Sequence, residues 1–289
     1  MQASMSTQSD ITTASATDRG RERAENQDNL GFFESTPLGP VWVICDGMGG
    51  SVGGKFASTM AMEKIREVVY EASCPEDEIK VGDVLRTAVE RANRAIYARA
   101  QEDTELKGMG TTAVVLAIRA GCAHVAHVGD SRLYLIREGQ ICQLTKDHTL
   151  VRGLVEQGII SAAQAKVHPQ SHVLSKAVGV KEILGVAVAE TPLKLHAGDR
   201  LLMCTDGLTS QIDDQTILEL VSFLDPHEAC GKLIALANEK GGPDNVTVQI
   251  VRVNALADAS VQLCPWWAWS LAAGLVTTAA IALWYHLSE

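Results

Sequence analysis

An apolar run that ends abruptly in an acid and glycines constrains this chain more than any other feature. Residues 41–45 are apolar and lead directly into Asp46-Gly47-Met48-Gly49-Gly50. Such a run is typical of a buried strand that ends in a tight turn. We therefore expect the carboxylate of Asp46 at the end of a strand, where the hydrophobic core stops.

One further stretch repeats this pattern, and a third acidic residue lies beside another apolar run. Residues 201–205 precede Asp206-Gly207, and Asp244 lies in a Gly/Pro turn just before the apolar residues 246–253. An Asp-Gly pair is typical of an ordinary turn, and that interpretation suffices for any one of these sites alone. Three carboxylates at strand ends instead predict one cluster of hard oxygen ligands, which Mg²⁺ and Mn²⁺ prefer.

Composition restricts the class of protein. A chain of 289 residues with 46% hydrophobic residues can form one large domain plus an appendage. The net charge of −10 argues against nucleic acid as a partner. The 7 cysteines form no CxxC pair, and Cys45 and Cys204 lie within apolar runs, which favours a reducing compartment. The polar first residues contain no apolar stretch, so no secretory signal is expected.

One domain is predicted over residues 11–253, after a disordered segment at residues 1–10. Amphipathic helices are expected at residues 54–72, 82–102, about 213–223 and 226–239. We interpret four strand-like stretches as consecutive antiparallel strands, at residues 111–119, 123–128, 132–137 and 140–144. The order of elements predicts an α+β fold, an α-β-β-α sandwich of two mainly antiparallel sheets flanked by helix pairs.

Residues 145–182 differ from the rest of this domain. A helix is expected at residues 150–157, followed by a short helical piece with Ser161 as its N-cap. His168-Pro169-Gln170 ends that piece. The segment therefore has the character of a flap, and a strand is expected to follow at residues 183–190.

The C-terminal residues predict a membrane anchor. After a linker at residues 254–264, residues 265–287 are expected to form a transmembrane helix. Residues 266–287 contain no Asp, Glu, Lys or Arg and carry aromatic residues at both ends. A helix of that length spans roughly 33 Å, against about 30 Å of hydrocarbon. A buried core helix is the alternative, but no polar face exists. These features predict a single-pass protein of the cell inner membrane with its catalytic domain in the cytoplasm.

Short motifs occur in a fixed order along residues 11–253. They are Arg23-x-x-x-Gln27-Asp28-Asn29, Asp46-Gly47-Met48-Gly49-Gly50, Gly110-Thr111-Thr112, Gly129-Asp130-Ser131-Arg132, Asp147-His148, Asp206-Gly207-Leu208 and Asp244-Asn245. Each is weak alone, but the ordered set resembles bacterial members of the metal-dependent protein phosphatase family, type 2C. The resemblance implies that residues 11–253 are a phosphatase domain. It also implies hydrolysis of phosphoserine and phosphothreonine in proteins by a metal-bridging hydroxide at a binuclear Mg²⁺/Mn²⁺ centre.

The resemblance also implies metal ligands. Asp46 matches the carboxylate that bridges the two metals, with the carbonyl of Gly47 as a further ligand. Asp206 and Asp244 match ligands of the first metal. Asp130, together with Asp206, matches a third and weaker metal site. Without the resemblance, Asp130 is interpreted as the cap of its own turn.

The implied catalytic residues are Arg23, Asp28 and Asp46. Asp28 matches a carboxylate that orients metal-bound water, and Arg23 matches the arginine that binds phosphate, for which its planar fork is suited. Arg23 could instead be a solvated loop residue. The implied partners are proteins phosphorylated on serine or threonine and a bacterial kinase that the enzyme opposes, with no nucleic acid.

Some residues depart from the family pattern. Met48 stands where eukaryotic relatives often carry a histidine that is a proposed general acid. Because methionine cannot donate a proton, the leaving group must receive its proton from metal-bound water or another group. Gln27 replaces a glutamate of those relatives, and Lys55 stands where bacterial relatives often carry a glutamate.

Four other polar residues have structural interpretations. His124 and His127 lie in a predicted strand and are expected to be core or surface residues, not ligands. Asp147 and His148 are expected to position the flap.

Two other functions remain open at this point. One is a regulatory module that binds phosphoproteins without catalysis; the presence of Asp46, Asp206 and Asp244 together argues against it. The other is a phosphoesterase that acts on small molecules, which nothing in the sequence excludes.

Overall fold

The computed structural model describes residues 10–73 and 78–256. Its first sheet contains five strands, which are β1 (Asp10–Asp18), β8 (Arg132–Arg137), β9 (Gln140–Gln143), β12 (Arg200–Cys204) and β13 (Val246–Ala255). The order across this sheet is β1-β13-β12-β8-β9, and every neighbouring pair is antiparallel.

The second sheet contains the strands β2 (Asn29–Thr36), β3 (Gly39–Cys45), β6 (Ala113–Arg119), β7 (Cys122–Val128), β10 (Ala187–Val188) and β11 (Leu193–Lys194). The order along it is β10-β7-β6-β3-β2, and β11 also pairs with β7. These pairs are antiparallel too. A separate two-stranded pair joins β4 (Gly47–Met48) to β5 (Gly110–Thr111).

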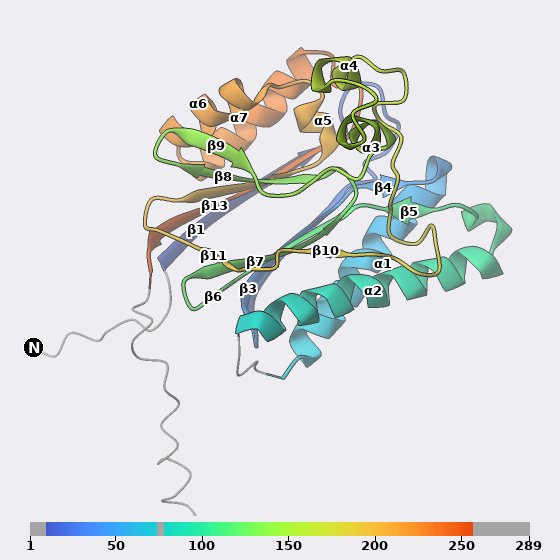
Figure 1. Ribbon diagram of the computed structural model, residues 1–289, viewed down its shortest axis with the longest axis horizontal. Helices are drawn as coiled ribbons and strands as arrows, with labels where there is room; N and C mark the ends of the chain where they lie inside the picture. The colour runs from blue at the N-terminus through green and yellow to red at the C-terminus, as the bar shows by residue number, and fades with distance from the viewer. Residues whose placement is uncertain (1–9, 74–77, 257–289) are drawn as a thin grey trace, which may run out of the picture.

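Helices cover the outer face of each sheet (Figure 1). The helices are α1 (Gly50–Glu71), α2 (Glu78–Glu102), α3 (Leu150–Glu156), α4 (Ala162–Lys166), α5 (Asp206–Thr209), α6 (Asp214–Phe223) and α7 (Pro226–Glu239), with a 3₁₀ turn η1 (Thr104–Leu106). Helices α1 and α2 lie on the second sheet, and α6 and α7 lie on the first. The structure confirms the predicted mixed α+β fold with antiparallel sheets.

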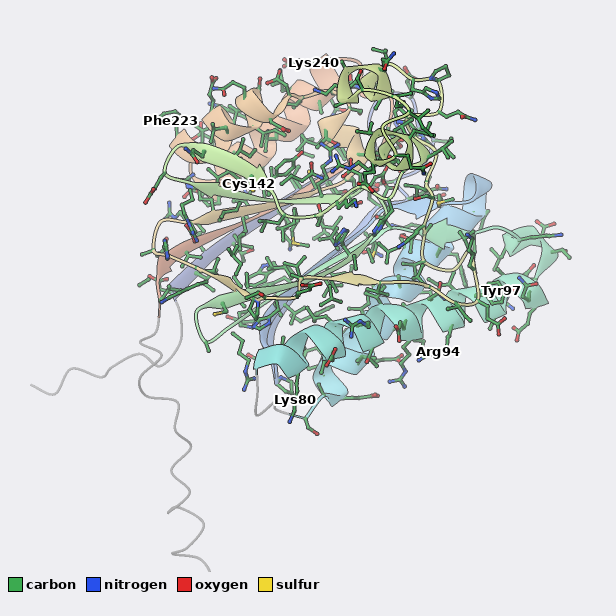
Figure 2. The ribbon with its side chains drawn as sticks, viewed as in Figure 1. Lys80, Arg94, Tyr97, Cys142, Phe223 and Lys240 are labelled. Atoms are coloured by element: carbon green, nitrogen blue, oxygen red, sulfur yellow. The ribbon has the colours of Figure 1, made fainter. Side chains whose placement is uncertain are left out.

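Three layers of buried side chains hold this sandwich together. One layer joins α1 and α2 to the second sheet, a second joins α5, α6 and α7 to the first sheet, and the third lies between the sheets. In Figure 2 side chains fill the space between the two sheets and the spaces between each sheet and its helices. Trp42, fully buried in the middle layer, donates its indole N–H to Thr13 Oγ1 of the opposite sheet at 3.0 Å. Because the core stops at the strand ends, polar groups collect there.

Strands β7 and β8 are not neighbours, contrary to the predicted run of consecutive antiparallel strands. They belong to different sheets, and Gly129-Asp130-Ser131 carries the chain from one to the other. Gly129 has φ 101°, and a Cβ there would lie 2.5 Å from Thr112 Cγ2, so only glycine allows this crossing. The pattern of apolar residues could not distinguish a hairpin from a change of sheet.

The strand predicted at residues 183–190 was also wrong in extent. Only β10, Ala187–Val188, pairs with β7 in that region. Leu184 and Val186 instead pack on the layer between α2 and the second sheet, and Asn93 Nδ2 donates to the carbonyls of Lys181 and Glu182. Packing against the helix explains why these residues are apolar.

Within the described residues, no helix is long and apolar enough to cross a membrane. The transmembrane helix predicted at residues 265–287 lies outside the described residues, as do nearly all of the predicted linker and the segment at residues 1–9.

Candidate metal centre and active site

Asp46 directly follows β3, and two threonines, Thr111 of β5 and the adjacent Thr112, fix its backbone. Its amide donates to Thr112 Oγ1 at 2.9 Å, and its carbonyl accepts from the amide of Thr112 and the hydroxyl of Thr111, both at 2.8 Å. Gly47 must be glycine, because a Cβ there would lie 2.1 Å from the carbonyl oxygen of Gly54. The strand end predicted for Asp46 is therefore held rigidly.

Asp206 and Asp244 lie at the ends of neighbouring strands of the first sheet. Asp206 follows β12 and begins α5, a short helix that the sequence pattern did not predict. Asp244 precedes β13, which pairs with β12. A Cβ on Gly207 would lie 2.0 Å from the carbonyl oxygen of Asn245, so the two loops approach as closely as glycine permits.

Asp28 lies just before β2 and is almost completely buried, with 3% of its surface exposed. Its Oδ2 accepts hydrogen bonds from Thr247 Oγ1 at 2.6 Å and Thr205 Oγ1 at 3.0 Å. Its Oδ1 is buried and has no partner among the described residues. Burial raises the pKa of Asp28 to about 7 against the hydrogen bonds from both threonines, and Asp206 adds to the rise.

The acidic residues influence one another's ionisation, so the structure brings them together. Burial, and then the charge of Asp28, raise the pKa of Asp46 well above its ordinary value. Burial and the charge of Asp206 raise the pKa of Asp130 to about 8. Burial and Asp244 raise the pKa of Asp206. Closely spaced carboxylates of this kind require protons or cations to neutralise them.

This donor set fits hard divalent cations. It offers carboxylate oxygens, a backbone carbonyl and the unpaired Oδ1 of Asp28, and it contains no sulfur ligand. Within residues 10–73 and 78–256, no three acidic, His or Cys side chains form a ready-made cage around one point. Mg²⁺ commonly binds through one or two carboxylates and keeps several waters, which suits such an open arrangement.

Asp28, Asp46, Asp130, Asp206 and Asp244 together form the acid cluster. Arg23 and a large cavity border it. Arg23 Nη2 lies 2.7 Å from Asp244 Oδ2, in an ion pair whose arginine side chain is 51% exposed. The cavity has a volume of about 1120 Å³, and Arg23, Asp130, Asp206 and Asp244 line it. Residues of α3 and α4, together with Ser171 and His172, line it as well.

Residues 145–182, the predicted flap, contain α3 and α4, and two residues near their start are anchored to the rest of the domain. Asp147 accepts from Arg132 Nε at 3.0 Å, from Arg132 Nη2 at 2.7 Å and from Gln143 Nε2 at 2.7 Å. His148 Nδ1 accepts from the amide of Gly129 at 3.1 Å, and its ring stacks on His127 with centroids 5.0 Å apart. Burial lowers the pKa of His148 to about 4, so its ring is neutral and can accept this bond. These contacts agree with a structural role.

The other residues singled out from the sequence also have clear positions. His124 and His127 are buried in β7, as expected for core residues. Lys55, for which the sequence offered no role, donates from Nζ to the carbonyl of Asp28 at 3.1 Å and so ties α1 to that loop. Gln27 Nε2 donates to the carbonyl of Gly50 at 2.8 Å. Met48 lies in the short strand β4.

Sequence reasoning missed three residues that hold the site together. Thr205 and Thr247 position Asp28, as described above. Asn245 Oδ1 accepts from the amide of Gln27 at 2.8 Å, and its Nδ2 donates to the carbonyl of Glu25 at 2.9 Å. The position of Asn245 directly after Asp244 was the available signal, but its partners are more than 200 residues away in sequence.

The fold and the carboxylate cluster define a class of protein that works with divalent cations. Residues 17–232 match the family model described as "Protein phosphatase 2C". The chain is 35% identical over 241 residues to the serine/threonine phosphatase stp of Listeria welshimeri, covering 83% of this chain and 95% of that protein. It is 36% identical over 243 residues to the serine/threonine protein phosphatase PstP of Mycobacterium tuberculosis, covering 83% of this chain and 44% of PstP, so it spans less than half of that relative.

Solved structures agree with this relationship. The crystal structure of PstP superposes with a TM-score of 0.76 at 34% identity and covers 84% of this chain and 99% of that one. A second structure, the PstP catalytic domain in complex with two manganese ions, has a TM-score of 0.72 at 33% identity and covers 84% of this chain and 97% of that one. The chain belongs to the protein phosphatase 2C family.

Proposed function

We propose that this chain hydrolyses phosphoserine and phosphothreonine in proteins, using Mn²⁺ or Mg²⁺ bound at the acid cluster. The observation that carries the proposal is the convergence of Asp28, Asp46, Asp206 and Asp244 at one end of the sandwich, beside Arg23. The similarity to serine/threonine phosphatases, one of them solved with two manganese ions, supports the same activity. The chain is thus a metal-dependent protein serine/threonine phosphatase.

Each acidic residue receives a role. Asp46, Asp206 and Asp244, with the carbonyl of Gly47, would hold two cations, and Asp130 with Asp206 would hold a weaker third. When bound, such cations lower the pKa of water and offset the charge of phosphoryl oxygens. That contribution is needed because phosphomonoester hydrolysis is among the slowest uncatalysed reactions, accelerated by enzymes up to about 10²¹-fold.

The remaining two residues act on water and substrate. Asp28 is buried with Oδ1 free, so it can accept a hydrogen bond from a water molecule and orient it towards the phosphorus. Arg23 is exposed at the cavity edge, where its planar group can bind two phosphate oxygens. The cavity continues beyond the acid cluster to the flap, which leaves room for residues flanking the phosphorylated one.

The proposal is tested with the full chain and a phosphothreonine peptide. We expect phosphate release with Mn²⁺ and none after EDTA treatment. Asp46→Asn and Asp206→Asn should each abolish turnover while the far-ultraviolet circular dichroism stays that of the wild type, because each loses an anionic oxygen that holds the cations. Asp83→Asn, on the exposed face of α2, serves as the matched control. Near-wild-type turnover of Asp46→Asn at saturating Mn²⁺ would refute the assignment.

The same assay separates the two alternative functions. A module that only binds phosphoproteins would retain the peptide and release no phosphate. A small-molecule phosphoesterase would hydrolyse phosphorylated metabolites with a higher kcat/KM than the peptide. The cavity that extends from the acid cluster to the flap favours the peptide.

The proposal extends to location and partners. Residues 265–287 would anchor the chain in the inner membrane with the catalytic domain in the cytoplasm, where it would oppose a serine/threonine kinase. The length and apolar character of residues 266–287 support the anchor. The free thiols of the described residues, including the exposed Cys142, are consistent with a reducing compartment.

A further inference from the structure

The reaction proposed above leaves one chemical requirement without a residue. A serine or threonine alkoxide is a poor leaving group, with a basicity close to that of hydroxide, whose parent water has a pKa of about 15.7. Its departure is assisted by a proton donor in the transition state. Met48, in the acid-glycine motif, carries no transferable proton. The donor must therefore be metal-bound water or another group that lines the cavity.

We propose that the imidazolium of His172, in the flap, donates the proton to the leaving serine or threonine oxygen. This inference rests on the proposed phosphatase function and adds a catalytic residue to it. His172 is the histidine among the described residues that line the cavity, which it shares with Arg23, Asp206 and Asp244. Histidine is the side chain that ordinarily changes charge between about pH 5 and pH 8, as a proton donor at neutral pH must.

Backbone hydrogen bonds hold the part of the flap that carries this imidazole. The amide of Leu150 donates to the carbonyl of Val173 at 2.8 Å, and the amide of Ser175 donates to the carbonyl of His148 at 2.8 Å. The backbone on the C-terminal side of His172 is thus paired with the start of α3, which Asp147 and His148 anchor. The imidazole itself is exposed and can exchange protons with solvent.

Electrostatics supports this placement. Burial and Asp244 raise the pKa of Asp206, whereas the positive charges of His172 and Arg23 oppose the rise, so His172 lies within electrostatic range of the cluster. Besides His172, the cavity lining contains charged side chains, which include Arg23, Asp130, Lys166, Asp206, Asp213, Asp214 and Asp244. Arg132 is paired with Asp147, and Arg152 with Glu156. The negative charge of the acidic residues in the cavity lining favours the imidazolium form of a histidine there.

The other cationic groups are poorer donors. Arginine does not lose its proton in proteins, and lysine ordinarily holds its proton up to about pH 10.4. The carboxyl groups are required as anions for the cations. Among the side chains of the cavity lining, an imidazole is therefore the type that can both hold and release a proton near neutral pH.

In the proposed step, water is the nucleophile and the serine or threonine oxygen is the leaving group. The oxygen of a water molecule bonds to phosphorus, and the bond from phosphorus to the side-chain oxygen breaks, with its electron pair passing to that oxygen. The imidazolium of His172 protonates the oxygen and releases a serine or threonine hydroxyl. Of the two protons of the attacking water, one remains on the released phosphate and the other restores the imidazolium, directly or through solvent.

The experiment compares two substrates that differ in their need for a proton donor. In a phosphothreonine peptide the leaving group is an alkoxide. In p-nitrophenyl phosphate the leaving group is a nitrophenolate. It is far less basic than the phenolate of tyrosine, whose parent phenol has a pKa of about 10. We expect His172→Ala to lower kcat for the peptide by about 10²- to 10⁴-fold and to leave kcat for p-nitrophenyl phosphate within about threefold of the wild type.

Further variants distinguish proton donation from a structural role. His172→Gln keeps the size and hydrogen bonding of the side chain but cannot transfer a proton, so it should behave as His172→Ala. Both variants should lose the alkaline decline of kcat for the peptide and keep the wild-type affinity for Mn²⁺ by calorimetry. His168→Ala, a flap histidine that does not line the cavity, should match the wild type.

Three results would overturn the inference. They are equal losses on both substrates, an unchanged kcat for the peptide, and recovery of peptide turnover in His172→Gln. These differ from failure of the proposed function, in which the wild-type protein with Mn²⁺ would not hydrolyse the phosphothreonine peptide.

Discussion

Among single residues, Arg23 lies where substrate and metal binding meet. It pairs with Asp244, a proposed metal ligand, yet both side chains are partly exposed, at 51% and 31%. Exposed pairs of this kind contribute about 0–1 kcal/mol. We expect Arg23→Ala to raise the KM for a phosphothreonine peptide by about tenfold or more and to change the dissociation constant for Mn²⁺ by no more than about fivefold.

Steady-state kinetics and Mn²⁺ calorimetry on the same preparation measure both quantities. Arg19→Ala, in the same loop but outside the cavity lining, is the matched control. Equal losses of metal affinity and peptide affinity would show that Arg23 is a structural residue of this loop.

The buried carboxyl groups predict how stability depends on pH in the absence of metal. Burial raises the pKa of Asp28 to about 7 and that of Asp130 to about 8 from an ordinary value of 3.8. The folded protein therefore binds these protons more tightly than the unfolded chain does. Their contribution to stability is complete below about pH 4 and is lost as the pH rises through about 7 to 8.

We accordingly expect the Tm of the EDTA-treated protein to fall between about pH 5 and about pH 8. Saturating Mn²⁺ should remove most of this fall, because the cations bind the ionised carboxylates. Asp130→Asn should make the fall less steep in EDTA. A Tm in EDTA that stays constant or rises over this range would show that the pKa values of these carboxyl groups are not raised in the folded protein.

Among single residues, the sequence predicted those whose position next to an apolar run indicates their role. Asp46 and Asp206 could be predicted from a short apolar run followed by an acid and a glycine, and Asp244 from a Gly/Pro turn that precedes an apolar run. Thr205, Thr247 and Asn245 could not, because their roles depend on partners that only the folded chain brings near, and threonine within a strand is ordinary.

Among the elements, the flap depends on a small polar junction. Arg132 of β8 makes three hydrogen bonds to the carboxylate of Asp147, and its Nη1 donates to Tyr134 at 2.8 Å. The side chains of Arg132 and Asp147 are only 25% and 18% exposed. Removing one partner would leave a largely buried charge without its bonds, which costs about 1–3 kcal/mol.

We therefore expect Asp147→Asn to lower the free energy of unfolding by about 1–3 kcal/mol and to speed amide hydrogen exchange across residues 148–176. The kcat/KM for the peptide should fall, while Mn²⁺ affinity should stay near the wild-type value. Urea unfolding and exchange followed by mass spectrometry measure these effects. Glu156→Gln, which removes only exposed ion pairs of the flap, should leave exchange unchanged. Unchanged exchange in Asp147→Asn would show that other contacts hold the flap.

Element types were more predictable than element neighbours. The long helices α1, α2, α6 and α7 follow from apolar residues at helical spacing, and Ser161 caps α4 as predicted. The crossing between β7 and β8 did not follow, because alternation of apolar residues is satisfied equally in either sheet. The short helix α5 begins at Asp206 itself, where the sequence indicated only a turn.

For the whole molecule, the remaining prediction concerns the membrane. Residues 266–287 are long enough to span about 30 Å of hydrocarbon and carry tryptophans near both ends. We expect the full-length protein in the membrane fraction, released only by detergent, and the protein lacking residues 265–289 in the soluble fraction. Attachment would hold the enzyme on the surface where membrane-bound substrates lie and so would raise its effective concentration towards them.

The two proteins should turn over a free phosphothreonine peptide equally, because both keep every cavity-lining residue of the described part of the chain. Dephosphorylation of a membrane-bound phosphoprotein should be slower without them. A full-length variant with Leu275→Arg and Val276→Lys tests whether hydrophobicity is responsible, because each charge at the centre of a span disfavours insertion by about 2.5–3.5 kcal/mol. A wild-type protein that fractionates as soluble without detergent would refute the anchor. Digestion of residues 11–253 by protease added outside spheroplasts would instead refute the cytoplasmic orientation, since the catalytic domain would then face the opposite side of the membrane.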